Sequence, residues 1–193
     1  QLLPGRGETV GAQLTGDDRV RGVMFTGSTE VATLLQRNIA SRLDAQGRPI
    51  PLIAETGGMN AMIVDSSALT EQVVVDVLAS AFDSAGQRCS ALRVLCLQDE
   101  IADHTLKMLR GAMAECRIGN PGRLTTDIGP VIDSEAKANI ERHIQTMRSK
   151  GRPVFQAVRE NSEDAREWQS GTFVAPTLIE LDDFAELQKE VFG

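Results

Sequence analysis

Residues 50–65 read IPLIAETGGMNAMIVD, in which two short apolar runs flank the polar sequence Glu55-Thr56-Gly57-Gly58. Short apolar runs bounded by glycine are typical of buried β-strands. The pattern predicts one strand over 50–54 and a second over 60–65. A carboxylate and two glycines therefore stand where the first strand ends.

Segments with helical and strand-like patterns alternate on both sides of this stretch. Further strands are predicted over 20–26, 93–98, 154–158 and 173–181. Helices are predicted over 8–14, 29–43, 69–85, 99–116 and 133–150, with Asp133 or Ser134 as the N-cap of the last one. This alternation predicts an α/β fold, with an open, twisted, largely parallel sheet flanked by helices.

Ligands of such folds bind beyond the carboxyl ends of the strands. Three loops of this sequence occupy that kind of position: Gly27-Ser28, Glu55 to Gly58, and Gly86 to Ser90. We therefore expect the functional residues in these loops.

Composition excludes several classes of function. The 20 Lys and Arg against 27 Asp and Glu give a net charge of −7, which disfavours binding to nucleic acid or to an anionic membrane surface. The absence of Tyr excludes a Tyr-Lys proton relay, and the two His cannot form a three-His zinc site. No signal peptide and no run of about 20 apolar residues is present, so membrane insertion is not expected.

The three cysteines are spaced unlike a zinc ribbon or a secreted disulfide framework, which indicates a reducing compartment such as the cytoplasm. Cys89 lies in a loop of small residues beside Arg88, where a thiolate nucleophile is possible. The alternative is a small buried side chain. Cys96, inside an apolar strand, is predicted to be a core residue, and Cys116, at the end of a helix, is predicted to be structural.

Two other loops admit both a functional and a structural interpretation. Glu55 ends an apolar strand, and partial burial there would raise its pKa toward the range of a general base; otherwise it is a cap. Backbone N–H groups after Gly27-Ser28 can bind phosphate at a helix N-terminus, or Ser28 can be a simple N-cap.

A cysteine hydrolase or acyltransferase is a further alternative. It needs an imidazole within hydrogen-bond reach of Cys89, and His104 and His143 are the only candidates. Both are predicted to be structural or surface residues. Trp168 lies in the charged stretch 161–169, which is predicted to be a solvated loop.

Four motifs taken together resemble the aldehyde dehydrogenase superfamily. They come in the order and at the separations usual in that family, with Cys89 placed 89 − 55 = 34 residues after Glu55. The motifs are FTGSTEVA over 25–32, ETGGMN over 55–60, GQRCS over 86–90 and EVFG over 190–193.

The resemblance implies a role for each of these residues. Cys89 is the nucleophile, its backbone N–H is half of the oxyanion hole, and Glu55 is the base for thioester hydrolysis. The cofactor is NAD, and no metal is expected. Its contacts are Gly11 near the adenine side and Gly27 and Ser28 at the pyrophosphate. Glu190 and Phe192 hold the nicotinamide ribose and ring, and the remaining contacts are Thr26, Thr56 and Gly57.

Finer features are similar to one branch of the family. Thr56 and the sequence after Cys89 resemble enzymes that oxidise L-glutamate γ-semialdehyde (Δ1-pyrroline-5-carboxylate), and Ser90 would then contact the substrate carboxylate. The stretch 3–11 resembles bifunctional bacterial proline-utilisation flavoproteins, whose separate proline dehydrogenase domain binds FAD. Other NAD(P)-dependent aldehyde dehydrogenases remain an alternative.

The resemblance also carries expectations about the extent of the chain. Residues 1–52 are expected to be the last unit of a Rossmann-like NAD-binding domain, and 53–193 a truncated catalytic domain. The second oxyanion donor and the loop that grips the substrate carboxylate would lie outside the chain, as would the strands of a homo-oligomer. The isolated chain is therefore expected to be inactive, and the other possibility is a folded but inert piece.

Overall fold

The structure is a computed structural model that describes residues 1–157 and 170–193. The chain forms two compact units, Gln1–Gly57 and Gly58–Gly193. The sequence-based division after residue 52 passes through a strand that is hydrogen-bonded within the first unit, so the observed division falls a few residues later.

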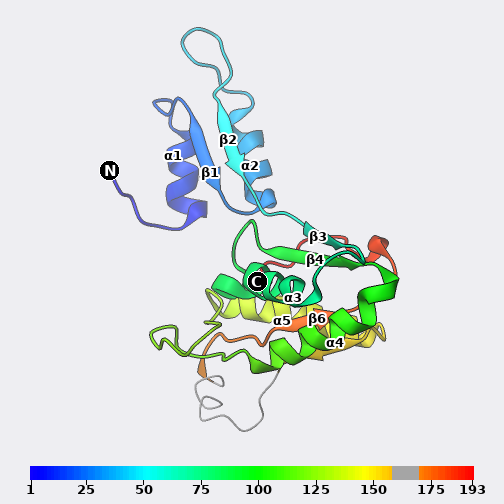
Figure 1. Ribbon diagram of the computed structural model, residues 1–193. Coiled ribbons are helices and arrows are strands. Elements are labelled where there is room, and N and C mark those ends of the chain that lie inside the picture. Colours follow the sequence, from blue (N-terminus) through cyan, green and yellow to red (C-terminus); the bar gives the residue numbers. More distant parts are fainter. Residues whose placement is uncertain (158–169) are drawn as a thin grey trace. The chain divides into compact units, whose positions relative to one another are not determined.

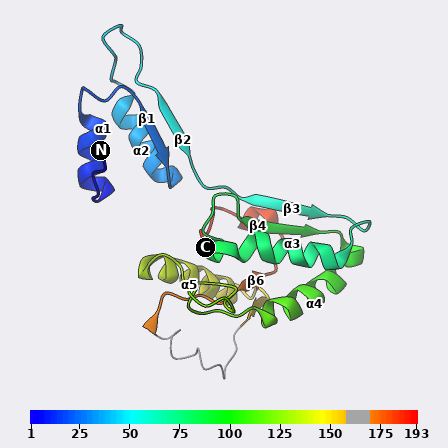
Figure 2. The same cartoon turned by 60° about the vertical axis from the view of Figure 1, so that its left-hand side comes forward.

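The first unit contains one parallel strand pair and two α-helices. The π-helix η1 (Gly7–Gly11) runs directly into α1 (Ala12–Gly16), followed by β1 (Val23–Thr26), α2 (Thr29–Ile39) and β2 (Leu52–Glu55). β1 and β2 are parallel, with Val23 opposite Leu52 and Thr26 opposite Glu55. Figures 1 and 2 show the two helices alongside this pair.

One arginine ties the helices of the first unit to the turn between them. The Arg42 guanidinium, just after α2, donates to the carbonyl groups of Thr15, Asp17 and Val20, the last two at 2.8 and 3.1 Å. These carbonyl groups lie at the end of α1 and in the loop before β1, so Arg42 holds the turn that leads into β1.

The second unit opens with a β-α-β crossover. β3 (Asn60–Val64) leads through α3 (Thr70–Phe82) and the 3₁₀ turn η2 (Asp83–Gly86) to β4 (Leu92–Leu97), which pairs with β3 in parallel. Both views show α3 running along this strand pair (Figures 1 and 2). A parallel pair requires such a crossover, and the helix covers the apolar face of the sheet.

Two longer helices and a short antiparallel pair complete the second unit. They are α4 (Asp99–Glu115), α5 (Ser134–Ser149), β5 (Val154–Gln156), β6 (Thr177–Ile179) and the 3₁₀ turn η3 (Phe184–Glu186). The main core lies between β3, β4, α3 and α4, and its most deeply buried side chains are Leu109 and Met113. The Asp133 carboxylate caps α5 by accepting from the Ala136 N–H at 2.8 Å, as predicted.

The predicted α/β class is confirmed, while several element boundaries differ. α2 ends at Ile39 because Leu43 instead forms a bridge with Pro49. The last strand covers only Thr177–Ile179, since Pro176 has no N–H to donate to a neighbouring strand. Within the described residues the strands form three two-stranded pairs, the last of them antiparallel.

Two further predictions concern the stretch after β5 and the crossing of a membrane. Val158, the charged stretch 161–169 and Trp168 lie outside the described residues. In the part of the chain that the structure describes, no helix has both the length and the apolar character needed to cross a bilayer.

Candidate functional site

The turn before Cys89 has an unusual backbone. Ser84 and Ala85 have φ values of 56° and 53°, and Gly86 follows at 67°. Asp83 leaves the helical conformation at the end of α3, and the three left-handed residues that follow direct the chain toward Cys89. This conformation costs about 1–2 kcal/mol for a residue with a Cβ, so the surrounding contacts must hold it in place.

Asn60 holds the loop from the first residue of β3. Its Nδ2 donates to the carbonyl oxygens of Cys89 and Ala91, at 2.7 and 2.9 Å. Both amide hydrogens of Asn60 are thus used on the backbone that carries the thiol. This contact joins two motifs of the sequence, ETGGMN and GQRCS.

Two neighbouring side chains fix the same loop from other directions. The Gln87 side-chain oxygen accepts from the backbone N–H of Ile132 at 2.7 Å, and the Arg88 Nε donates to the Ser84 hydroxyl at 3.0 Å. Gln87 therefore connects the loop to the segment that leads into α5. The backbone around Cys89 is held by several side chains.

The chain end 190–193 meets this loop through Arg93. The Arg93 Nε and Nη2 both lie 3.3 Å from Oε1 of Glu190, and the guanidinium carbon lies 5.3 Å from the centre of the Phe192 ring. The same Nη2 donates to the Arg88 carbonyl oxygen at 3.3 Å. The Arg93 side chain therefore contacts both the cysteine loop and two of the predicted cofactor contacts, Glu190 and Phe192.

Cys89 itself is exposed, as expected for a reactive thiol, and so is Ser90. No hydrogen bond from the Cys89 N–H occurs within residues 1–157 and 170–193. Cys96 and Cys116 are only half-buried, so Cys96 is less deeply buried than predicted for a core residue. Across the described residues, no group of His, Cys, Asp and Glu side chains is arranged to hold a metal ion.

Neither imidazole is hydrogen-bonded to the Cys89 sulfur in the described part of the chain. His143 lines an apolar hollow of about 750 Å³ in the second unit, and Cys89 is not part of that lining. Burial first, and then the charges of Lys150 and Lys189, lower the pKa of His143. The structure gives no support to a cysteine–histidine hydrolase.

In the first unit, two predicted loops lie side by side. The Gly27 N–H donates to the Glu55 carbonyl oxygen at 3.1 Å, which places Gly27-Ser28 next to the end of β2. The Ser28 hydroxyl caps α2 by accepting from the Val31 N–H at 3.2 Å. The capping interpretation of Ser28 is therefore confirmed, and it leaves Gly27 and Ser28 exposed.

The side chain of Glu55 is exposed within its unit, so the expected partial burial is not found. The reason is its place at the last residue of a two-stranded pair, where only its backbone is engaged. Thr26 is exposed opposite it, while Thr56 and Gly57 are half-buried. A Cβ at Gly27 would collide with the Phe25 ring, which explains the glycine there.

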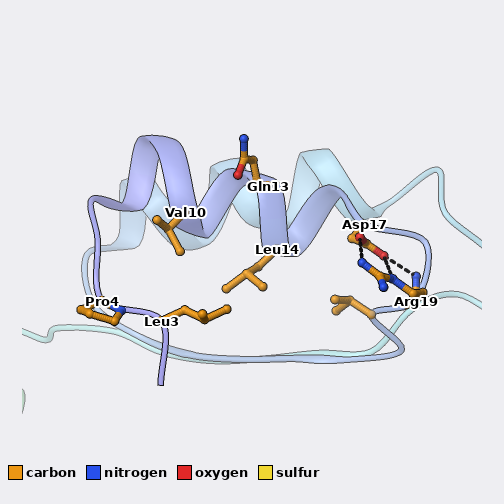
Figure 3. Close-up of a pocket in the computed structure, with 8 residues that line it drawn as sticks. Leu3, Pro4, Val10, Gln13, Leu14, Asp17 and Arg19 are labelled. Atoms are coloured by element: carbon orange, nitrogen blue, oxygen red, sulfur yellow. Dashed lines mark hydrogen bonds and ion pairs between the residues drawn. The ribbon is translucent and has the colours of Figure 1, made fainter. Parts of the chain in front are cut away.

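A hollow of about 590 Å³ lies beside α1 (Figure 3). It is lined by Leu3, Pro4, Val10, Gln13, Leu14, Asp17, Arg19 and Val20. The Arg19 guanidinium binds the Asp17 carboxylate at 2.8–2.9 Å, which holds the pKa of that carboxyl well below its usual range. Gly11 is not part of this lining, and space for a Cβ on Gly11 is open.

Sequence reasoning did not identify Asn60, Gln87 or Arg93. Two signals were available: Arg93 is a charged residue at the start of an apolar strand, and Asn60 is a polar residue at the start of another. Both are costly to bury without partners. The partners themselves lie tens of residues away in the sequence.

Comparison with known proteins places this geometry in context. A family model described as the aldehyde dehydrogenase family matches residues 1–193. The chain is 92% identical over its full length to the bifunctional protein PutA of Salmonella typhimurium. It is 33% identical, over 99% of its length, to 1-pyrroline-5-carboxylate dehydrogenase of Anoxybacillus flavithermus. The chain spans 15% and 36% of the lengths of these relatives.

Solved structures share the fold. A crystal structure of bifunctional proline utilization A (PutA) superposes with a TM-score of 0.86 at 46% identity, over 98% of this chain and 18% of that one. A point mutant of betaine aldehyde dehydrogenase from Staphylococcus aureus gives a TM-score of 0.87 at 29% identity, over 98% and 37%. That protein was solved with NAD+ and a BME-modified cysteine.

Proposed function

Because this chain belongs to the aldehyde dehydrogenase family, we propose that it carries the thiol chemistry of an NAD-dependent enzyme that oxidises L-glutamate γ-semialdehyde to L-glutamate in proline catabolism. The observation that carries this proposal is the exposed Cys89 thiol on a loop whose backbone is held by Asn60, Gln87 and Arg93. The relatives named PutA and 1-pyrroline-5-carboxylate dehydrogenase support the substrate class.

The first step uses Cys89. Its thiolate attacks the aldehyde carbon, and the carbonyl oxygen takes the electron pair and becomes an oxyanion. The backbone N–H of Cys89, which donates to no group within the described residues, is available to that oxygen. The product is a thiohemiacetal on Cys89. Because Asn60, Gln87 and Arg93 hold the Cys89 loop before the reaction, the loop needs little reorganisation during it.

Each unit contributes residues that we propose to hold NAD. Gly27 and Ser28 present the exposed N-terminus of α2, where N–H groups accommodate a pyrophosphate without basic side chains. Gly11, Thr26, Thr56 and Gly57 complete the set in the first unit. In the second unit, Glu190 and Phe192 would take the nicotinamide ribose and ring. When bound, NAD+ accepts a hydride from the thiohemiacetal carbon, which leaves a thioester on Cys89.

Glu55 is proposed to activate the water that hydrolyses this thioester. In a grafted enzyme, in which these 193 residues replace the matching segment of the Salmonella PutA relative, Glu55→Gln is therefore expected to slow steady-state turnover by about 10²–10³-fold. An initial burst of NADH of one equivalent per site should remain. Rapid-mixing absorbance at the NADH band measures both phases. Glu71→Gln, in the first turn of α3, is the matched control and should behave as the unsubstituted protein. Loss of the burst together with steady-state turnover would contradict the role of Glu55 in hydrolysis.

We further propose that the first unit is part of the nucleotide-binding domain and the second part of the catalytic domain. The remaining proposals are that the active protein is a cytoplasmic homo-oligomer and that the second oxyanion donor comes from residues outside these 193. FAD would serve only a separate proline dehydrogenase domain. The chain spans 37% of the betaine aldehyde dehydrogenase that was solved with NAD+, which is consistent with a site that needs more residues.

These proposals predict that the 193-residue chain alone forms NADH slowly. A suitable reference is a grafted enzyme, in which these residues replace the matching segment of the Salmonella PutA relative. With glutamate semialdehyde and NAD+, the chain alone should be at least about 10²–10³-fold slower, because one oxyanion donor contributes that much. Equal rates would contradict the proposal. A panel of other aldehydes, including betaine aldehyde, and NADP+ tests the alternative of a different substrate or cofactor.

A further inference from the structure

Arg93 is a buried charge inside the second unit. It follows the first residue of β4, and its side chain is 8% exposed. An arginine cannot lose its proton in a protein, so burial at this level is costly unless the guanidinium is paired. Its partners therefore show what the buried charge is used for.

Those partners come from two separate parts of the site. On one side are the Glu190 carboxylate and the Phe192 ring, and on the other is the Arg88 carbonyl oxygen, next to Cys89. The guanidinium also packs on Gly86, where an added Cβ would lie 3.2 Å from Nη1. Arg93 thus touches the residues before the thiol and two residues proposed to meet the cofactor.

The way Arg93 holds Glu190 is asymmetric. Both Nε and Nη2 approach the same oxygen, Oε1, at 3.3 Å. Across the described residues, Oε2 of Glu190 has no hydrogen-bond partner, and this side chain is 20% exposed. One carboxylate oxygen is therefore fixed by Arg93, while the other is left to accept from a ligand hydroxyl.

From this geometry we propose that Arg93 is a positioning residue that couples the cofactor contacts Glu190 and Phe192 to the Cys89 loop. The proposal rests on the proposed function of those residues. Any movement of Glu190 or the Phe192 ring on binding a nicotinamide nucleotide changes the position of the guanidinium. Because the same group holds the Arg88 carbonyl oxygen, the thiol loop responds to cofactor binding.

A second arginine of the same unit provides a matched comparison. Arg152 pairs with Asp182 and Glu186, and its side chain is 24% exposed. It is therefore also a partly buried ion-paired arginine, but its partners Asp182 and Glu186 are not residues of 86–93 or 190–193. Arg152→Met removes a partly buried ion pair and changes no residue of the proposed site.

The experiment compares Arg93→Met, Arg93→Lys and Arg152→Met in the grafted enzyme. Steady-state kinetics give kcat and the two KM values, and the rate of Cys89 alkylation by iodoacetamide is measured with and without saturating NAD+. For Arg93→Met we expect the KM for NAD+ to rise about tenfold, because a charge-assisted pair is lost, while the KM for the aldehyde changes less than twofold. The change in alkylation rate that NAD+ causes in the unsubstituted protein should fall to near zero.

The variants separate a coupling role of Arg93 from a merely structural one. Arg93→Lys keeps a positive charge beside Glu190, so it is expected to recover part of the change in alkylation rate that NAD+ causes. Arg152→Met should keep all of that change. An unchanged KM for NAD+ and an unchanged NAD+ effect in Arg93→Met would overturn the coupling role. Equal losses in both arginine variants would show a merely structural role. If the unsubstituted grafted enzyme forms no NADH at all, the proposed function fails, whatever Arg93 does.

Discussion

Cys89→Ser is expected to abolish aldehyde oxidation in the grafted enzyme, with a loss of at least about 10³-fold in kcat/KM. A serine hydroxyl stays protonated at neutral pH, whereas a thiol forms an appreciable thiolate fraction. An oxygen ester is also less suited than a thioester to the hydrolytic second step. NADH formation with glutamate semialdehyde measures the loss.

Alkylation of the 193-residue chain tests the same residue without turnover. A brief treatment with iodoacetamide should label Cys89 first, because it is exposed while Cys96 and Cys116 are half-buried. Peptide mass spectrometry locates the label. Cys116→Ala is the control and should keep its activity in the grafted enzyme. A serine variant with more than a tenth of the original kcat/KM would exclude Cys89 as the nucleophile.

Gly86→Ala is expected to destabilise the second unit by about 2–5 kcal/mol. The φ of Gly86 is +67°, a conformation that costs about 1–2 kcal/mol for alanine. The added Cβ would also lie 2.9 Å from the Ala81 carbonyl oxygen and 2.9 Å from the backbone carbon of Gly193. Overpacking of this kind usually adds about 1–3 kcal/mol. Backbone atoms cannot move away as a flexible side chain can.

Urea unfolding followed by circular dichroism measures this effect through the midpoint and slope of the transition. Gly111→Ala is the matched control, because Gly111 lies inside α4 with no atom within 4 Å of its added Cβ. It should stabilise the protein by about 0.5–1 kcal/mol, since alanine favours helix more than glycine. Equal midpoints for the two variants would contradict the packing argument at Gly86.

Local patterns were enough to predict much of the fold. The run from Asn60 to Val64, the apolar positions of Val73 and Val77, and the run from Leu92 to Leu97 indicate strand, helix and strand, and the structure contains all three. Parallel pairing of β3 with β4 follows from the length of the crossover. These features depend on residues close in sequence, whose hydrophobic period is visible directly.

Element ends were less predictable, because tertiary contacts compete with helix propensity. α3 ends at Phe82 although the predicted helix runs to Ala85, because Asp83 leaves the helical conformation and Ser84 and Ala85 then adopt positive φ. Leu43 leaves the pattern of α2 to pair with Pro49. No local rule predicts such choices, since their stabilising partners lie elsewhere in the chain.

The candidate site divides in the same way. Cys89, Glu55, Gly27 and Ser28 are recognisable from residue type and from their places after strands, so the sequence determined which chemistry to look for. Only the tertiary structure showed that Asn60 and Arg93 hold the cysteine loop, and that Arg93 joins it to Glu190, 97 positions away. A nucleophile is a property of one side chain, whereas its positioning depends on hydrogen bonds that exist only after distant segments have packed together.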